Sequence, residues 1–169
     1  MRTPSLLGIA LLCLSAMPAA MDDGNQNSLK QCDGQHKDWY RTGQYCIRYF
    51  NMPCSFDVAE STCSQAPGAH LVSVHSSQEN EDVFSLLGSA SSAPRIWLGG
   101  YRDGQSNKFI WKDGSNWDYQ NWVPGQPSYT SHTENCVEMN WKNQKQWNDD
   151  LCSNKKPFVC AFRRQQGQD

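Results

Sequence analysis

The sequence predicts a single α+β domain in which two helices precede a small antiparallel sheet that carries a long ordered loop. Three observations support this prediction: two amphipathic helical patterns in the first half, a series of short strand patterns after Gly88, and eight cysteines in 169 residues. So many cysteines in a short chain indicate a disulfide framework, provided that the protein leaves the cytosol.

The N-terminus has the layout of a cleaved secretory signal. Arg2 precedes an apolar run over residues 6–14, and small residues follow as far as Ala20. The run is too short to cross a bilayer, which needs roughly 20 apolar residues. We therefore expect residues 1–20 to be removed together with Cys13, which leaves a secreted, extracellular protein with seven of the eight cysteines and no membrane span.

The rest of the chain is predicted to form one domain between two polar ends. Residues 21–31 are expected to be a flexible N-terminal segment, 32–163 the folded domain and 164–169 a flexible tail. Lys and Arg total 15 against 17 Asp and Glu, so the chain lacks the basic surplus that nucleic-acid binding requires. No His-Glu-x-x-His, Gly-x-Ser-x-Gly or Cys-x-x-Cys pattern occurs, and we expect no enzymatic activity.

The first predicted helix begins after Ser55, a residue type that favours the N-cap position. Its apolar side chains recur at helical spacing and should form one buried face. The members of this face are Phe56, Ala59 and Cys63.

The second predicted helix begins after Ser76, which stands three residues before Glu79, the spacing of a capping box. Gly88 is expected to end it. Its buried stripe is predicted to consist of Val83, Phe84 and Leu87. Between the two helices, residues 71–74 are predicted to form a short strand.

After Gly88 the sequence changes to short strand patterns separated by turn signals, of which Asp103-Gly104 is the strongest. Strands are predicted at 96–100, 109–111, 136–139, 146–147 and 157–160. The intervening stretch 113–131 is rich in Asn, Gly, Pro and Ser. A loop of this length is usually functional or disordered, and its two tryptophans indicate that it is packed.

Taken together, these segments resemble the C-type lectin-like domain family. The resemblance covers nearly the whole domain, with several motifs in the same order: 59–63, 68–73, 96–99, 111–115, 121–122, 134–137, 147–152 and 157–160. The chain is most similar to the small secreted fish members, the nattectin-like galactose lectins and the type II antifreeze proteins. The resemblance implies two helices packed on small antiparallel sheets with a long ordered loop, stabilised by disulfide bonds.

The resemblance also implies three disulfide bonds, whose connectivity spacing alone does not fix. They are Cys63–Cys160 between the first helix and the last strand, Cys136–Cys152 beneath the long loop, and Cys32–Cys46 near the N-terminus. Cys54 is then left unpaired. It could form an intermolecular bridge that makes a disulfide-linked homodimer, stay a buried thiol, or exchange with one of the N-terminal pair.

Oxygen-bearing side chains gather in the last third of the chain. Glu134 shortly precedes Cys136, and the pair Asn148-Asp149 shortly precedes Cys152. If the two cysteines are bonded, Glu134 therefore lies close to this pair. Amide, carboxylate and hydroxyl oxygens are the ligands that Ca²⁺ prefers. The alternative is that these side chains are solvated or cap the loop's own backbone. The set consists of Gln126, Ser128, Glu134, Asn148 and Asp149.

In the family that the chain resembles, a tripeptide with a central cis-proline, a glutamate and a Trp-Asn-Asp turn form a Ca²⁺ site, where sugar hydroxyls bind the ion. Gln-Pro-Asp accompanies galactose-type sugars, and this chain has Gln126-Pro127-Ser128. The resemblance thus implies Ca²⁺ as cofactor, galactose-type glycans as partners and the five oxygen-bearing residues as metal ligands. With serine at position 128 only Glu134 and Asp149 contribute charge, so we expect a weakened site.

Two further residues of the loop, Tyr129 and His132, are candidates to stack on the apolar face of a sugar; the alternative is that they are surface residues without a ligand. The expected carbohydrate-binding residues are therefore these two with Gln126, Ser128, Glu134 and Asn148. The predicted function is a secreted lectin, Ca²⁺-dependent and of galactose type. The alternative is a lectin-like protein without sugar binding, such as a type II antifreeze protein or a protein-binding venom or immune factor.

Overall fold

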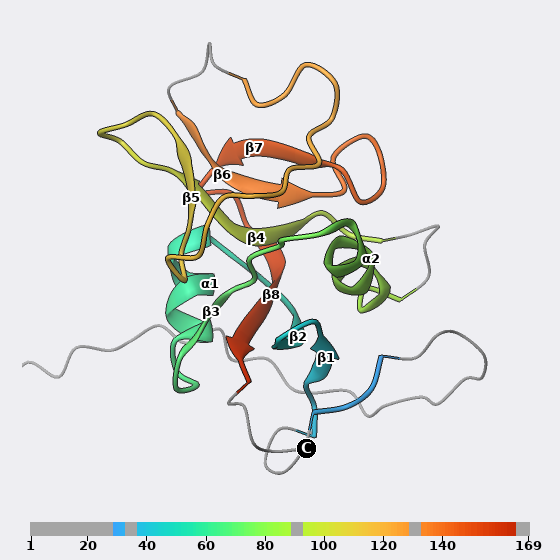
Figure 1. The fold of residues 1–169 in the computed structure, drawn as a ribbon. Coiled ribbons are helices and arrows are strands. Elements are labelled where there is room, and N and C mark those ends of the chain that lie inside the picture. Colours follow the sequence, from blue (N-terminus) through green and yellow to red (C-terminus); the bar gives the residue numbers. More distant parts are fainter. Residues whose placement is uncertain (1–28, 33–36, 89–92, 129–132, 165–169) are drawn as a thin grey trace, which may run out of the picture.

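The structure is a computed structural model that describes residues 29–32, 37–88, 93–128 and 133–164. The predicted signal at 1–20, most of the segment 21–31 and the end of the tail lie outside the described residues. Figure 1 shows the arrangement of the elements. They are β1 (Tyr40–Thr42), β2 (Tyr45–Cys54), α1 (Phe56–Cys63), β3 (Ala69–Leu71), α2 (Ser77–Ser85), β4 (Ile96–Arg102), β5 (Phe109–Trp111), β6 (Glu134–Met139), β7 (Trp147–Leu151) and β8 (Lys156–Arg163).

The described strands form one eight-stranded sheet whose main path is β1-β2-β8-β4-β6-β7, with β3 beside β8 and β5 beside β4. The paired strands of the sheet are antiparallel except β4 and β8, which run parallel where Trp97 faces Phe158. The sheet is therefore mostly antiparallel, as expected, with one parallel pair in addition. Turn signals identify antiparallel hairpins between neighbours in sequence, whereas parallel strands need a long connection that leaves no local signature.

β1 and β2 were not among the predicted strands. β2 pairs with β8 in continuous register from Tyr45 to Phe50, and its register shifts only between Phe50 and Cys54. Adjacent residues Cys46 and Ile47 are both buried. The period of two that identifies a strand is therefore absent from this segment.

The strand predicted at 71–74 is displaced toward the N-terminus and ends at Leu71. Val72 nevertheless connects two strands of the sheet. Its N–H donates to the Val159 carbonyl at 2.9 Å, and its own carbonyl accepts from the Gly99 N–H at 2.8 Å. A side chain at Gly99 would collide with the Leu71 carbonyl at 2.4 Å, so only glycine permits this close approach.

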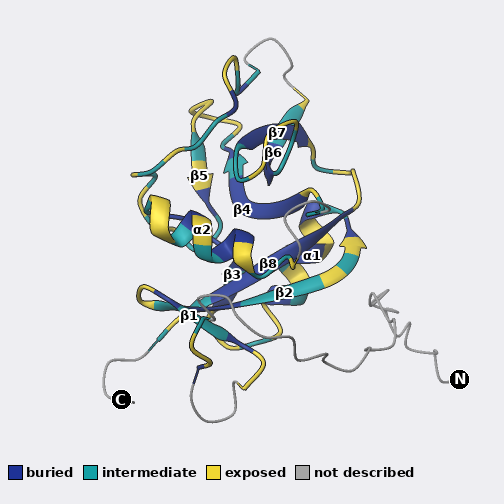
Figure 2. Cartoon of the chain, turned by 90° about the vertical axis from the view of Figure 1, so that its right-hand side faces the viewer, coloured by how far each residue is buried: buried dark blue, intermediate teal, exposed yellow. Residues whose placement is uncertain are grey.

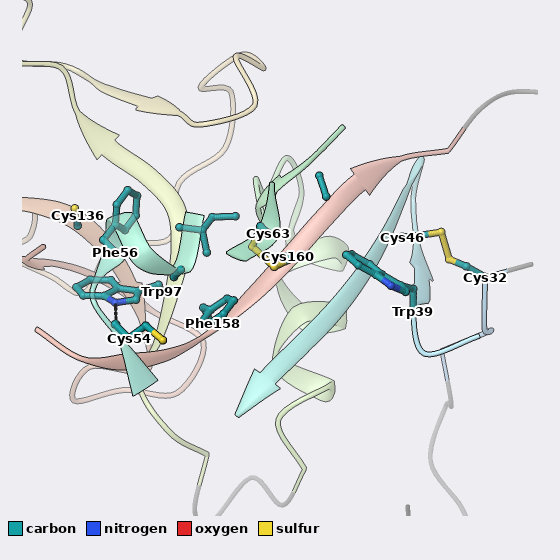
Figure 3. Packing of buried hydrophobic residues seen from close by; sticks show 13 residues of the cluster. Cys32, Trp39, Cys46, Cys54, Phe56, Cys63, Trp97, Cys136, Phe158 and Cys160 are labelled. Carbon is teal, nitrogen blue, oxygen red and sulfur yellow. Dashed lines mark hydrogen bonds between the residues drawn. A yellow bond between two sulfur atoms is a disulfide. The ribbon is translucent and has the colours of Figure 1, made fainter. Parts of the chain in front are cut away.

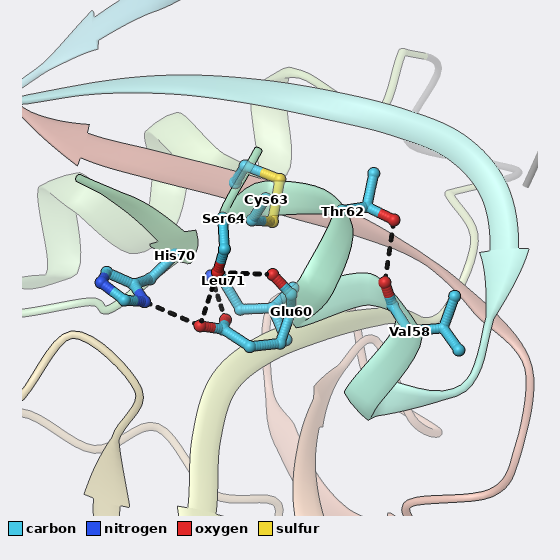
Figure 4. The surroundings of a disulfide bond; sticks show 8 residues. Val58, Glu60, Thr62, Cys63, Ser64, His70 and Leu71 are labelled. Atoms are coloured by element: carbon cyan, nitrogen blue, oxygen red, sulfur yellow. Dashed lines mark hydrogen bonds and ion pairs between the residues drawn. A yellow bond between two sulfur atoms is a disulfide. The ribbon is translucent and has the colours of Figure 1, made fainter. Parts of the chain in front are cut away.

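The helix α1 buries the predicted face of Phe56, Ala59 and Cys63. Ser55 stands at its N-cap, but the side chain makes no capping hydrogen bond. The helix is joined to β3 through Glu60, whose carboxylate accepts from the Leu71 N–H at 2.9 Å and lies 2.7 Å from His70 Nδ1 (Figure 4). Glu60 thus gives His70 a structural role at the junction of α1 and β3.

The helix α2 has the predicted N-cap, because Ser76 Oγ accepts from the Glu79 N–H at 3.2 Å. Val83 and Phe84 are buried as expected. Leu87 is only half-buried, since the helix already ends at Ser85. Within the described residues, no helix combines the length and the apolar character needed to cross a membrane.

All three implied disulfide bonds are present: Cys32–Cys46, Cys63–Cys160 and Cys136–Cys152. Figure 3 shows the second joining α1 to the central strand β8. Cys54 is buried and is itself disulfide-bonded, and the described residues contain no free cysteine. The expectation of an unpaired Cys54 is therefore not met in the full-length chain. A bridge from Cys54 to a second chain after removal of residues 1–20 stays a prediction.

The core lies along β4 and β8, which are buried over most of their length (Figure 2). On the α1 side, Phe56 meets Trp97 edge to face with ring centroids 5.7 Å apart (Figure 3). The Trp97 indole N–H donates to the Cys54 carbonyl at 3.0 Å, as a buried indole requires. A second aromatic group, built around Trp111 and Trp147, supports the long loop.

Candidate functional site

The long loop between β5 and β6 is packed against Trp147 of β7, as its two tryptophans had indicated. The Trp147 N–H donates to the Asn121 carbonyl at 2.8 Å, and the Trp147 carbonyl accepts from the Val123 N–H at 2.9 Å. The rings of Trp117 and Trp122 lie 6.0 and 5.9 Å from that of Trp147. The described part of the loop is thus fixed to the strand that carries the Asn-Asp pair (Figure 1).

Trp147 is held in turn by Asn80 of α2, a buried polar residue that the sequence had not singled out. Asn80 Oδ1 accepts from the Trp147 indole N–H at 2.8 Å, and its amide donates to the Lys145 carbonyl at 3.0 Å. Its position in the apolar stripe of α2 was the only sequence signal, because its partners lie in a distant segment.

We expect Asn80→Ala to lower the free energy of unfolding by about 1–3 kcal/mol, because it leaves a buried indole N–H without a partner. Urea denaturation measures the change. The control is Asn51→Ala, since Asn51 is exposed on β2 and its loss should cost less than about 0.5 kcal/mol. Equal effects in the two variants would contradict the anchoring role of Asn80.

The tripeptide Gln126-Pro127-Ser128 contains the cis-proline bond that the resemblance implied. The Ser128 N–H donates to both carboxylate oxygens of Asp149, at 2.9 and 3.1 Å. The fold therefore brings two of the predicted ligands together. Gln126 Oε1 is buried, and the described residues provide it with no hydrogen-bond partner. An orphaned buried oxygen of this kind calls for an explanation such as an ion or ligand.

Asp149 is fully buried, and Arg102 at the end of β4 balances its charge. Arg102 Nη2 lies 3.0 Å from Asp149 Oδ2, with side-chain exposures of 6% and 0%. Arg102 could not be identified from the sequence, because 47 positions separate it from Asp149. Only the pairing of β4 with β6 and of β6 with β7 brings them together.

Glu134, at the start of β6, lies within electrostatic reach of the same carboxylate. Partial burial raises the pKa of Glu134 above its ordinary value, and the negative charges of Asp149, Asp150 and Glu138 raise this pKa further. Each of these neighbours disfavours the ionised form, whereas a nearby cation would favour it. Glu134 thus lies near three other carboxylates.

Asn148 makes its contacts away from the Ser128–Asp149 pair. Its amide donates to Glu138 Oε1 at 2.9 Å and to the Asp149 carbonyl at 2.7 Å. Successive side chains of a strand point to opposite faces, which explains why Asn148 and Asp149 have different partners although they are adjacent. Among the described residues, the Asn148 amide nitrogen therefore contacts the backbone of Asp149 but no side chain of the other predicted ligands.

Asn148 instead adjoins a buried ionic cluster that sequence reasoning also missed. Glu138 is fully buried and accepts from Arg95 Nε at 2.7 Å. Lys156 Nζ lies 3.4 Å from Glu138 Oε2 and also pairs with Asp150. Two cations thus face two carboxylates, and the cluster ties β6, β7 and β8 together behind the candidate site.

The side chains present fit Ca²⁺ in part. The Gln126 amide oxygen and the Glu134 carboxylate are hard oxygen donors of the kind that the ion prefers. Asp149 is already engaged by Arg102 and by the Ser128 N–H. Where the chain is described, no group of three or more His, Cys, Asp or Glu is placed to hold a metal ion. Tyr129 and His132 lie outside the described residues.

In the described part of the chain, a mixed sheet combines with two helices, three disulfide bonds and a long loop that contains a cis-proline tripeptide. These features define a lectin-like domain. The family model described as "Lectin C-type domain" matches residues 52–162. The chain belongs to the C-type lectin family, which confirms the resemblance.

Individual relatives agree with this assignment. The chain is 38% identical over 117 residues to a lectin of Pleurodeles waltl, covering 68% of each chain. It is 32% identical over 126 residues to the galactose-specific lectin nattectin of Thalassophryne nattereri, covering 74% of this chain and 78% of that one. The fold superposes on the herring type II antifreeze protein with a TM-score of 0.69 and 30% identity, covering 76% of this chain and 98% of that one.

Proposed function

We propose that the protein is a secreted lectin that binds galactose-type glycans at the end of the long loop. The single observation that carries this proposal is the orphaned amide oxygen of Gln126, buried beside the cis-proline and in need of a ligand. The similarity to a relative named as galactose-specific supports it. The proposed sugar site comprises Gln126, Ser128, Glu134, Asn148 and Asp149, with Tyr129 and His132 as stacking residues.

Ca²⁺ is the proposed cofactor. Its three main proposed ligands are Gln126, Glu134 and Asp149. The ion, when bound, offers a positive centre to the hydroxyl oxygens of a sugar. Gln126 and Glu134 orient the same hydroxyls by accepting hydrogen bonds from them. Two carboxylates, one of them already paired, make this a low-affinity site.

The proposed function predicts retention of the purified protein on galactose-agarose in millimolar Ca²⁺ and release by free galactose or EDTA. Glu134→Gln should abolish retention, because it removes a charged ligand from a site that has few. The matched control is Glu81→Gln, since Glu81 is half-exposed on α2 and pairs with Lys145. Retention of the Glu134→Gln variant equal to that of the control would refute the assignment.

A second candidate is an ice-binding protein without sugar recognition. The pairing of Asp149 with Arg102 favours it, because it withdraws a carboxylate from metal and sugar. The similarity to the herring antifreeze protein is consistent with it. Thermal hysteresis in an ice-growth assay, together with no retention on galactose, mannose or N-acetylglucosamine matrices, would establish this alternative over the lectin.

A further inference from the structure

Arg102 is the residue whose position the family resemblance does not account for. It belongs to none of the matched motifs, yet its guanidinium reaches the buried carboxylate of Asp149, with Nη2 3.0 Å from Oδ2. The side chains of both residues are almost completely excluded from solvent. The ion pair is thus part of the interior at the point where the metal ligands were predicted to converge.

Among the described residues, three groups hold this guanidinium in place. It lies over the ring of Phe109, 4.6 Å from the ring centroid, a position that favours a cation. Its Nη1 donates to Asn107 Oδ1 at 3.2 Å. Asn107 lies in the turn between β4 and β5 and adopts a left-handed backbone conformation with φ of 57°. In this conformation its side chain points toward Arg102. Asp149 is the third group. Arg102 is therefore a buried cation in a fixed position and not a mobile surface charge.

The fixed positive charge of Arg102 makes Asp149 a poorer ligand for a metal ion. One carboxylate oxygen faces the guanidinium, and both accept from the Ser128 N–H. A divalent ion that used Asp149 would have to share the carboxylate with a fixed positive charge a few ångströms away, or displace it. Either event opposes binding, since like charges at short range repel strongly in a partly dry site.

We propose that Arg102 is an internal cation that competes with Ca²⁺ for Asp149 and thereby sets the metal affinity of the lectin site. This inference rests on the proposed Ca²⁺ site and adds the residue that regulates it. Without Ca²⁺ the guanidinium compensates the buried carboxylate, so the loop end keeps its arrangement in the absence of the metal. With Ca²⁺ the ion takes over Asp149 only when its concentration overcomes the competition.

Isothermal titration of the purified protein with CaCl₂ tests the proposal directly. Arg102→Gln removes the charge but keeps a polar side chain, and we expect Ca²⁺ to bind about tenfold or more tightly than to the unmodified chain. The matched control is Arg48→Gln. Arg48 also lies over a phenylalanine ring, that of Phe50 at 4.9 Å, and near an aspartate, Asp38 at 3.7 Å. It belongs to β2, on the far side of β8 from the site, so the control should bind Ca²⁺ like the unmodified chain.

Thermal unfolding gives a second readout that needs no sugar. Arg102→Gln leaves Asp149 uncompensated, so the variant should melt at a lower temperature in EDTA and recover much of the loss in Ca²⁺. A ligand that binds only the folded state stabilises it in this way. The unmodified chain and Arg48→Gln should show a much smaller Ca²⁺ effect. If Arg102→Gln does not fold in EDTA, Asn107→Gly loosens the guanidinium while suiting the left-handed backbone, and it should tighten Ca²⁺ in the same direction.

The outcomes separate this inference from the proposed function. Tight Ca²⁺ binding by Arg102→Gln with none detectable in the unmodified chain supports the competition and overturns natural Ca²⁺ dependence. Equal Ca²⁺ affinity in both proteins, with Asn107→Gly also unchanged, overturns the competition and leaves a galactose lectin standing if galactose retention is observed. Weaker Ca²⁺ binding by Arg102→Gln also overturns it.

Discussion

Asp149→Asn is expected to lower the free energy of unfolding by about 3–5 kcal/mol, the range for removing one partner of a buried ion pair. The substitution preserves shape and leaves an oxygen to accept from the Ser128 N–H. It removes the charge that faces Arg102, whose side chain is only 6% exposed. An uncompensated guanidinium would then remain in the interior. The same change should eliminate Ca²⁺ binding, because the proposed site loses one of its two charges.

Urea denaturation at neutral pH with the disulfides intact measures this effect. Asp118→Asn is the control: Asp118 is half-exposed and pairs with His75, so its loss should cost no more than about 1 kcal/mol. The double variant with Arg102→Gln should be less destabilised than the sum of the single variants, because the two residues contact each other. Strict additivity would show that the pair does not act as a unit.

Removal of the Cys63–Cys160 disulfide by replacing both residues with serine is expected to cost about 4–5 kcal/mol of stability. In the chain-entropy model the cost grows with the length of chain that the bond closes, and here the two cysteines are 97 positions apart. The bond also joins α1 to β8, the strand at the centre of the sheet. The serine variant should therefore be close to the limit of stability for a domain of this size.

The N-terminal disulfide provides the comparison. Cys32 and Cys46 are separated by 14 positions, so replacing both with serine should cost only about 3 kcal/mol. Denaturation of the two serine variants under identical conditions gives the order of the effects. A larger loss for the N-terminal pair would mean that strain or packing, and not loop closure, determines what these bonds contribute.

Most of the fold could be predicted because its signals are local or belong to spaced motifs. The Ser76 cap lies within one helical turn of its partner, and the faces of α1 and α2 repeat at helical spacing. The three disulfide pairings followed from the resemblance. β2 escaped prediction because adjacent residues such as Cys46 and Ile47 are both buried, so buried and exposed residues do not alternate along it. The parallel pairing of β4 with β8 depends on long connections that carry no local signature.

The sequence allowed us to predict which residues belong to the candidate site, but not which contacts they make. The sequence placed Gln126, Glu134 and Asp149 in one region, but it could not specify the partners of each oxygen. Arg102 and Asn80 act through residues 47 and 67 positions away, and such partners emerge only from the completed sheet. Asn148 was grouped with Asp149 by adjacency, whereas the alternation of a strand gives the two different surroundings.

The attachment of the long loop to Trp147 has a consequence for solubility. β7 is the last strand on the path of the sheet. The outward N–H and C=O groups of such an edge strand can pair with a strand of another chain when nothing covers them. Asn121 and Val123 occupy those groups at Trp147. The segment that presents the candidate site therefore also covers the start of β7 at Trp147, so shortening it to alter ligand preference would risk self-association of the protein.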